Sequence, residues 1–120
     1  AVGVGPLSVG SDGGGSVRIP RSFCGLFGHK PTFGRIPAYP LSPFGTVANI
    51  GPISRKVGDS AILMNVITTP HKDDWYSLPS ENIDYTKYNF ENIKSLRIGV
   101  IKYFGMKNFF HDIYKRIKVL

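Results

Sequence analysis

The chain has 120 residues, of which 42% are hydrophobic and 12% aromatic, and this composition excludes a disordered polypeptide. The formal net charge is +7, but no basic run exceeds two residues, so the charge indicates a solvated surface and argues against nucleic-acid binding. A single cysteine, Cys24, excludes an internal disulfide and fits a reducing compartment.

The two ends of the sequence indicate a piece of a longer protein. The chain starts at Ala1 without a methionine and stops at Leu120 inside a stretch with helical spacing. No apolar run approaches the ~18 residues that a membrane span requires. We therefore expect an internal fragment of a cytoplasmic protein that does not contact a membrane.

The first thirty residues are rich in glycine and contain short apolar stretches. Leu7 to Gly10 predicts a short strand, whereas Ser11 to Gly15 is not expected to form regular structure. Pro20 suits the first turn of a short helix, because the N–H that proline lacks has no helical partner there, and Gly25 would end that helix. Residues 26–30 predict a second strand.

The middle of the chain predicts a loop followed by a helix. Residues 31–52 contain five prolines and three glycines, which favours a long ordered loop with aromatic anchors. Residues 57–68 form the clearest helix, and its apolar residues on nearly every side predict burial on more than one face. Asp59 in its first turn suits the helix dipole, and Pro70 would end it.

The last third of the chain predicts a peripheral loop, a strand and a helix. Residues 69–92 are polar and indicate a surface loop. Residues 96–101 predict a strand, and the apolar spacing of residues 112–120 predicts a helix. A strand followed by a helix favours an α/β protein.

The segment most informative about function is Gly10 to Pro20, which reads Gly-Ser-Asp-Gly-Gly-Gly-Ser-Val-Arg-Ile-Pro. Consecutive glycines permit backbone conformations in which successive N–H groups converge and bind an anion. Ser16 follows directly. A hydroxyl in that position is suited to attack an amide carbonyl while the N–H groups stabilise the oxyanion.

Two other interpretations of this segment remain open from the residues alone. One is a glycine turn with a purely structural role. The other is a phosphate-binding loop, because Gly10 and Gly15 have the matching spacing; however, the lysine that such a loop requires after the second glycine is missing. A catalytic serine, a structural turn and phosphate binding are therefore all retained at this point.

The sequence resembles the amidase signature family over most of its length. Gly10 to Pro20, then Ser22 to Gly25 and Gly28 to Arg35, resemble the second half of the signature, and the likeness continues through Gly51 to Arg55 and Asp59. The resemblance implies an α/β fold in which a mixed β-sheet core is flanked by helices. It divides residues 1–120, one partial amidase domain, into the second half of the signature (1–35), a loop and buried helix (36–68), and a peripheral loop, strand and truncated helix (69–120).

The resemblance also implies a reaction and its residues. Members of the family hydrolyse amides through an acyl-enzyme on the serine of a Ser–cis-Ser–Lys triad, releasing ammonia or an amine and a carboxylic acid. The nucleophile matches Ser16, and the oxyanion hole matches the backbone N–H groups of Gly13, Gly14, Gly15 and Ser16. The lysine and bridging serine lie upstream of Ala1 in the family, so we expect this fragment alone to be inactive.

The same resemblance implies a small-molecule amide as the binding partner and no metal or organic cofactor. A homodimer is compatible with this interpretation, and the sequence does not decide the oligomeric state. Asp12 and Arg18 flank the glycine turn with opposite charges, and we expect them to support its shape by pairing.

Other side chains have simpler interpretations. Cys24 is a rival nucleophile, but a cysteine hydrolase needs an activating histidine, and we expect Cys24 to be a small buried packing residue. The aromatic residues are expected in the core, with one or two of them lining an acyl pocket: Phe23, Phe27, Phe33, Tyr39 and Phe44.

Local motifs favour the general amidases within the family. Residues 40–46 and 75–79 look like general amidases. In glutamyl-tRNA amidotransferase, the A subunit usually has glutamine at the position of Ile19 and Tyr-Gly-Leu in place of Tyr39-Pro40-Leu41. That amidotransferase component, which would deliver ammonia to a partner acting on tRNA, is the main alternative. A non-catalytic remnant that keeps the glycine loop for structure is the other.

Overall fold

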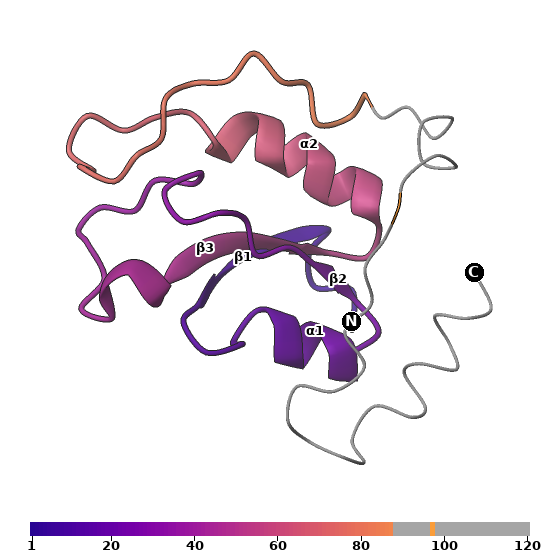
Figure 1. Cartoon of the computed structure of the whole chain (residues 1–120). Coiled ribbons are helices and arrows are strands. Elements are labelled where there is room, and N and C mark those ends of the chain that lie inside the picture. The colour runs from indigo at the N-terminus through magenta and orange to yellow at the C-terminus, as the bar shows by residue number, and fades with distance from the viewer. Residues whose placement is uncertain (88–96, 98–120) are drawn as a thin grey trace. The chain divides into compact units, whose positions relative to one another are not determined.

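The computed structural model describes residues 1–87 and Arg97. Residues 1–87 belong to the first of two units into which the chain divides, Ala1–Tyr88. Two helices and one 3-10 turn accompany a three-stranded sheet there (Figure 1). In chain order the elements are β1 (Leu7–Asp12), α1 (Arg18–Phe23), β2 (Phe27–Gly28), η1 (Gly45–Val47), β3 (Asn49–Ser54) and α2 (Val57–Ile67).

The sheet has the strand order β1-β3-β2, and both of its pairings are antiparallel. Leu7 of β1 lies opposite Ser54 of β3, and Asp12 lies opposite Asn49, so the two strands pair along their full lengths. The α/β class expected from the sequence is confirmed. The strand of residues 96–101 and the helix of residues 112–120 lie outside the described residues.

The two helices lie on opposite faces of the sheet (Figure 1). Val17, next to α1, packs close to Gly10 of β1 and Gly28 of β2, where an added Cβ would come within 3.1 Å of its methyl groups. On the other face, the hydroxyls of Ser54 in β3 and Ser60 in α2 are hydrogen-bonded at 2.7 Å. The central strand β3 therefore supports α2, whereas Val17 beside α1 packs against β1 and β2.

Strand β3 is the element that the sequence did not predict, because it falls at the end of the proline-rich segment expected to be a loop. Proline lacks the N–H that a ladder requires, so Pro52 argues against a central strand. His29 donates its N–H to the Pro52 carbonyl at 3.0 Å, which directs the ring nitrogen of Pro52 to the β2 side. The two-residue pairing with β2 ends there, so the missing donor interrupts little of the ladder.

Strands β1 and β2 also differ in length from the expectation. β1 includes Ser11 and Asp12, which were expected to be irregular, because β3 provides partners for them in Ile50 and Asn49. β2 is confined to Phe27 and Gly28 within the predicted range 26–30. Pairing between strands, which the local sequence does not reveal, sets both lengths.

Helix α1 ends as its sequence predicts. Gly25 adopts a φ of +63°, a left-handed conformation that favours glycine. The N–H of Leu26 donates to the Arg21 carbonyl at 2.8 Å, and the N–H of Gly25 donates to the Ser22 carbonyl at 3.5 Å. These two bonds form a Schellman motif, which satisfies carbonyls that the helix leaves without partners.

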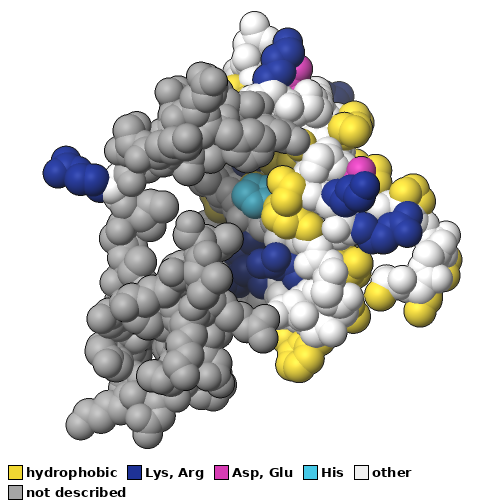
Figure 2. Space-filling view, turned by 90° about the vertical axis from the view of Figure 1, so that its right-hand side faces the viewer, with side chains coloured by type: hydrophobic (Ala, Val, Ile, Leu, Met, Phe, Trp, Pro, Cys, Tyr) yellow, Lys and Arg dark blue, Asp and Glu magenta, His cyan; other side chains and the backbone are white. Residues whose placement is uncertain are grey.

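Helix α2 ends one residue before its predicted end at Thr68, and its burial differs from the prediction. Ser60, Ala61 and Met64 are buried, whereas Ile62 and Val66 on the opposite face are 56% and 68% exposed. Within the described residues the helix is therefore buried on one face only. Figure 2 shows the same pattern more broadly, with hydrophobic side chains scattered over the surface among lysines and arginines.

The loop of residues 31–48 is ordered by contacts with residues 74–81. Arg35 donates to the Pro79 carbonyl at 3.2 Å and pairs with Glu81, and Leu78 donates its N–H to Gly34 at 2.9 Å. Asp74 is buried, although residues 69–92 were expected to form a surface loop. No helix in the described part of the chain is long and apolar enough to cross a membrane.

The central position of β3 yields a stability prediction. A Cβ on Gly51 would overlap the carbonyl oxygen of His29, which is backbone and cannot rotate away. Gly51→Ala should therefore lower the free energy of unfolding of the complete protein by about 1–3 kcal/mol, measured by urea denaturation. Gly5→Ala, whose Cβ would meet its nearest atom at 3.8 Å, is the matched control. Equal stability of the two variants would contradict the described packing of β3 against His29.

Candidate active site

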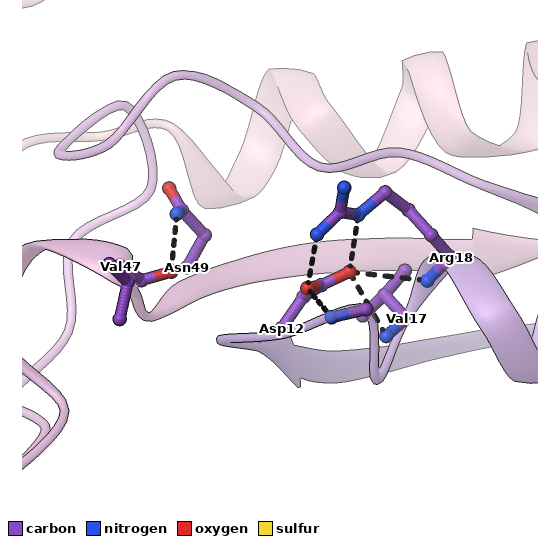
Figure 3. A network of polar contacts seen from close by, with 6 residues as sticks. Asp12, Val17, Arg18, Val47 and Asn49 are labelled. Carbon is purple, nitrogen blue, oxygen red and sulfur yellow. Dashed lines mark hydrogen bonds and ion pairs between the residues drawn. The ribbon is translucent and has the colours of Figure 1, made fainter. Parts of the chain in front are cut away.

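The glycine-rich loop joins the end of β1 to the start of α1 and curls around one carboxylate (Figure 3). Asp12, the last residue of β1, is fully buried. Its carboxylate accepts the N–H groups of Gly15 at 2.6 Å, Val17 at 3.2 Å and Arg18 at 3.2 Å. These hydrogen bonds fix the path of the loop from the strand into the helix.

Arg18 completes the neutralisation of this buried charge. Its Nε donates to Asp12 Oδ2 and its Nη2 donates to Oδ1, each at 2.9 Å, so the pair is bidentate. The expected pairing of these two residues is therefore present. The guanidinium is the main reason that the pKa of Asp12 lies well below its ordinary value, and the three backbone donors reinforce it against the opposing effect of burial. Asp12 in turn raises the pKa of Arg18.

The Asp12 network changes the set of backbone donors expected at the oxyanion hole. The N–H of Gly15 is one of the four, and it is occupied by the Asp12 carboxylate. Within the described residues, the N–H groups of Gly13, Gly14 and Ser16 have no acceptor. The sequence held a signal for this hydrogen bond, since an aspartate side chain often accepts a backbone N–H a few residues later in a turn.

Gly15 is required by the loop for two physical reasons. Its φ of +122° lies in the region that side-chain-bearing residues rarely adopt, and a Cβ would come within 2.6 Å of the Ile19 side chain. Its carbonyl accepts the N–H of Ile19 at 2.7 Å, which begins the turn into α1. Gly15 therefore has a structural role in the glycine triplet.

Gly13 and Gly14 form the open side of the same loop. A Cβ on either residue would meet no described atom within 4 Å, and neither residue has a positive φ. Ser16 is exposed, as are these two glycines. The loop therefore presents a hydroxyl-bearing residue and three N–H donors at a surface that the described residues leave free.

The geometry supports neither Cys24 as a nucleophile nor a metal site among the described residues. Cys24 is exposed, so the expectation of a buried packing residue is wrong, and no hydrogen bond among the described residues joins it to His29. In that same part of the chain, no group of three or more histidine, cysteine, aspartate or glutamate side chains lies close enough to hold a metal ion.

Comparison with known proteins identifies relatives over nearly the whole chain. The Amidase family model matches residues 1–118. The A subunit of the glutamyl-tRNA(Gln) amidotransferase of Thermodesulfovibrio yellowstonii is 41% identical over 112 residues, which cover 92% of this chain and 23% of the relative. Its counterpart from Staphylococcus haemolyticus is 37% identical over 119 residues, which cover 98% of this chain and 24% of that relative. The chain thus spans about a quarter of the length of these relatives.

Solved structures show the same relationship. A 6-aminohexanoate cyclic dimer hydrolase complexed with substrate has a TM-score of 0.61 and 36% identity, covering 68% of this chain and 18% of that chain. The A subunit of the Thermotoga maritima glutamyl-tRNA(Gln) amidotransferase has a TM-score of 0.51 and 38% identity, covering 65% of this chain and 17% of that one. Both similarities reach beyond the glycine loop to the surrounding fold.

The buried carboxylate yields a prediction on stability and its pH dependence. Asp12→Asn keeps the size but removes the charge that holds Arg18 and the loop amides. It should lower the free energy of unfolding of the complete protein by about 2 kcal/mol near pH 7. The native carboxylate has a depressed pKa, so its contribution is complete above the unfolded-state pKa of about 3.9 and is lost as the pH falls below it.

Thermal unfolding of wild type and variant at several pH values measures this difference. The gap in Tm should be constant between about pH 5 and 8 and should shrink below about pH 4. Asp73→Asn, at a side chain that is 46% exposed, is the control and should change the Tm little. A gap that does not depend on pH would show that the charge is not what stabilises the loop.

Proposed function

Because the chain belongs to the amidase family, whose model matches residues 1–118, we propose that the complete protein hydrolyses carboxylic amides with Ser16 as its nucleophile. The observation that carries the proposal is the conformation of the glycine loop. The Asp12 carboxylate holds Gly15, Val17 and Arg18, and within the part of the chain that the structure describes the N–H groups of Gly13, Gly14 and Ser16 are left available beside the exposed Ser16. A nucleophile next to several fixed donors is what acyl transfer requires.

The proposed reaction proceeds in two steps through an acyl-enzyme. Ser16 Oγ forms a bond to the amide carbonyl carbon as its proton passes to a base, and the carbonyl oxygen becomes an oxyanion that the free loop amides bind. Collapse of this intermediate breaks the C–N bond, and ammonia or an amine leaves with a proton. Water then attacks the serine ester and releases the carboxylic acid.

The base that receives the proton is not assigned to a residue of this chain. The family resemblance implies a lysine that acts through a bridging serine, and neither has a match in residues 1–120. We assign Asp12 and Arg18 a supporting role, since their charges pair with each other and the Asp12 carboxylate also accepts the loop N–H groups. They fix the loop amides and do not take part in proton transfer.

A second candidate function is that of an amidotransferase A subunit. The two relatives that support it, from Thermodesulfovibrio yellowstonii and Staphylococcus haemolyticus, are amidotransferase A subunits that are 41% and 37% identical to this chain. Acyl transfer at Ser16 would then release ammonia for a partner chain. Ile19 and Pro40 depart from the pattern usual in those proteins, which favours a general amidase. Co-purification of further subunits with the complete protein, together with ammonia release from glutamine, would favour the second candidate.

Replacement of the proposed nucleophile tests the main proposal. Ser16→Ala in the complete protein should reduce kcat for amide hydrolysis by at least about 1000-fold, because the acyl-enzyme cannot form. Ser22→Ala removes an exposed hydroxyl from α1 and is the matched control. Release of ammonia from a panel of simple amides measures the rates. Equal rates in the Ser16→Ala variant and the wild type would reject Ser16 as the nucleophile.

The open side of the loop gives a second test that separates function from folding. Gly14→Ala adds a methyl group where no described atom lies within 4 Å, at a φ that alanine tolerates. If substrate occupies that space, kcat/KM should fall about 100-fold through misplacement of the carbonyl, while the Tm changes little. An unchanged kcat/KM would mean that the substrate does not lie against this side of the loop, and a large loss of Tm would contradict the open space described at Gly14.

A further inference from the structure

A cavity of about 160 Å³ lies at the end of the sheet where β3 begins. Its walls come from the loop of residues 31–48, from the first residues of β3 and from residues 74–76. Most of the large side chains in these walls are apolar: Phe33, Ile36, Leu41, Ile50 and Tyr76. The rings of Phe33 and Tyr76 pack at a tilted angle with their centroids 5.2 Å apart, which gives one wall a fixed aromatic surface.

The buried carboxylate and the side-chain amide N–H in the cavity wall, from Asp74 and Asn49, are already engaged. Asp74 accepts the N–H of Ala38 through Oδ2 and the N–H of Tyr76 through Oδ1, both at 2.9 Å. Asn49 donates its side-chain amide to the Val47 carbonyl at 3.3 Å. The one carboxylate in the lining therefore serves to hold the loops together, and the cavity is suited to an apolar group.

The cavity is close to the loop that presents Ser16. Asn49 and Ile50 line the cavity, and they lie directly opposite Asp12 and Ser11 in the β1–β3 ladder. Directly opposed residues in an antiparallel pair are about 5 Å apart at Cα. Asp12 holds the glycine loop through its carboxylate, and Figure 3 shows this network beside Asn49. The wall therefore begins one strand away from the residue that anchors the nucleophile loop.

We propose that this cavity, the acyl cavity, receives the apolar part of the acyl group whose carbonyl Ser16 attacks. The inference rests on the proposed function and adds a substrate class to it: amides of aromatic or short branched carboxylic acids. The volume fits such a group, since an apolar cavity of about 150 Å³ accommodates benzene. A charged acyl group would lose its hydration without gaining a partner there.

The direct test is ligand binding, which does not depend on catalysis. Calorimetry with the complete protein carrying Ser16→Ala compares benzamide with acetamide. The added substitution Ala48→Leu fills the cavity from its wall and should weaken benzamide binding about tenfold or more, with little effect on acetamide. Thr46→Leu adds the same side chain at a neighbouring exposed residue outside the lining and should affect neither amide.

A second variant changes the cavity in the opposite direction and protects the test against misfolding. Leu41 is 45% exposed, so Leu41→Ala enlarges the cavity at a position where truncation disturbs the fold little. In the protein with Ser16 intact, this variant should raise kcat/KM for 2-naphthamide relative to benzamide by about tenfold. Ala48→Leu should shift the preference towards acetamide.

The outcomes separate this inference from the proposed function. In one outcome Ser16→Ala abolishes hydrolysis, but Ala48→Leu and Leu41→Ala leave the amide preferences and the benzamide affinity unaltered. This result would overturn the proposal that the acyl cavity binds the acyl group and would leave Ser16 as the nucleophile. In another outcome Ala48→Leu weakens benzamide binding, but Ser16→Ala retains hydrolysis. This result would support the cavity as a binding site for the acyl group and would reject Ser16 as the nucleophile. A rise in Tm with Ala48→Leu and no effect on benzamide would identify the cavity as a packing void.

Discussion

The candidate site depends on one buried carboxylate. Asp12 ends β1, and its two oxygens accept hydrogen bonds from three loop N–H groups and from the Arg18 guanidinium. Removing a charge from water is costly unless it is paired and hydrogen-bonded, and here both conditions are met. The carboxylate thereby converts a flexible glycine segment into a loop with a defined path.

The same hydrogen bonds divide the backbone donors of the loop between structure and chemistry. The N–H groups of Gly15, Val17 and Arg18 satisfy Asp12, and within the described residues those of Gly13, Gly14 and Ser16 remain available. A donor that is fixed before the reaction stabilises developing charge without a reorganisation cost. Asp12 is thus the physical link between the fold and the proposed oxyanion hole, although it is placed to touch no substrate.

Strand β3 connects this loop to the second region of interest. Its first residue, Asn49, pairs with Asp12 and also lines the apolar cavity, so the two regions share one end of the sheet. Asp74 has a role on the cavity side like that of Asp12 on the loop side, since it is buried and accepts two backbone N–H groups from different segments. Two buried carboxylates therefore order the two loops that flank the start of β3.

The sequence determined the features that depend on neighbouring residues: the glycine-serine motif and its family, the Schellman end of α1 at Gly25, the bounds of α2 to within one residue and the pairing of Asp12 with Arg18. Only the tertiary structure decided the existence of β3, the two-residue extension of β1, the burial of Asp74 and the occupation of the Gly15 amide. Local patterns report conformational preference and periodicity, whereas strand pairing and burial require partners distant in the chain. Pro52 is the clearest case: by itself it argues against a strand, and the short reach of β2 makes it tolerable in one.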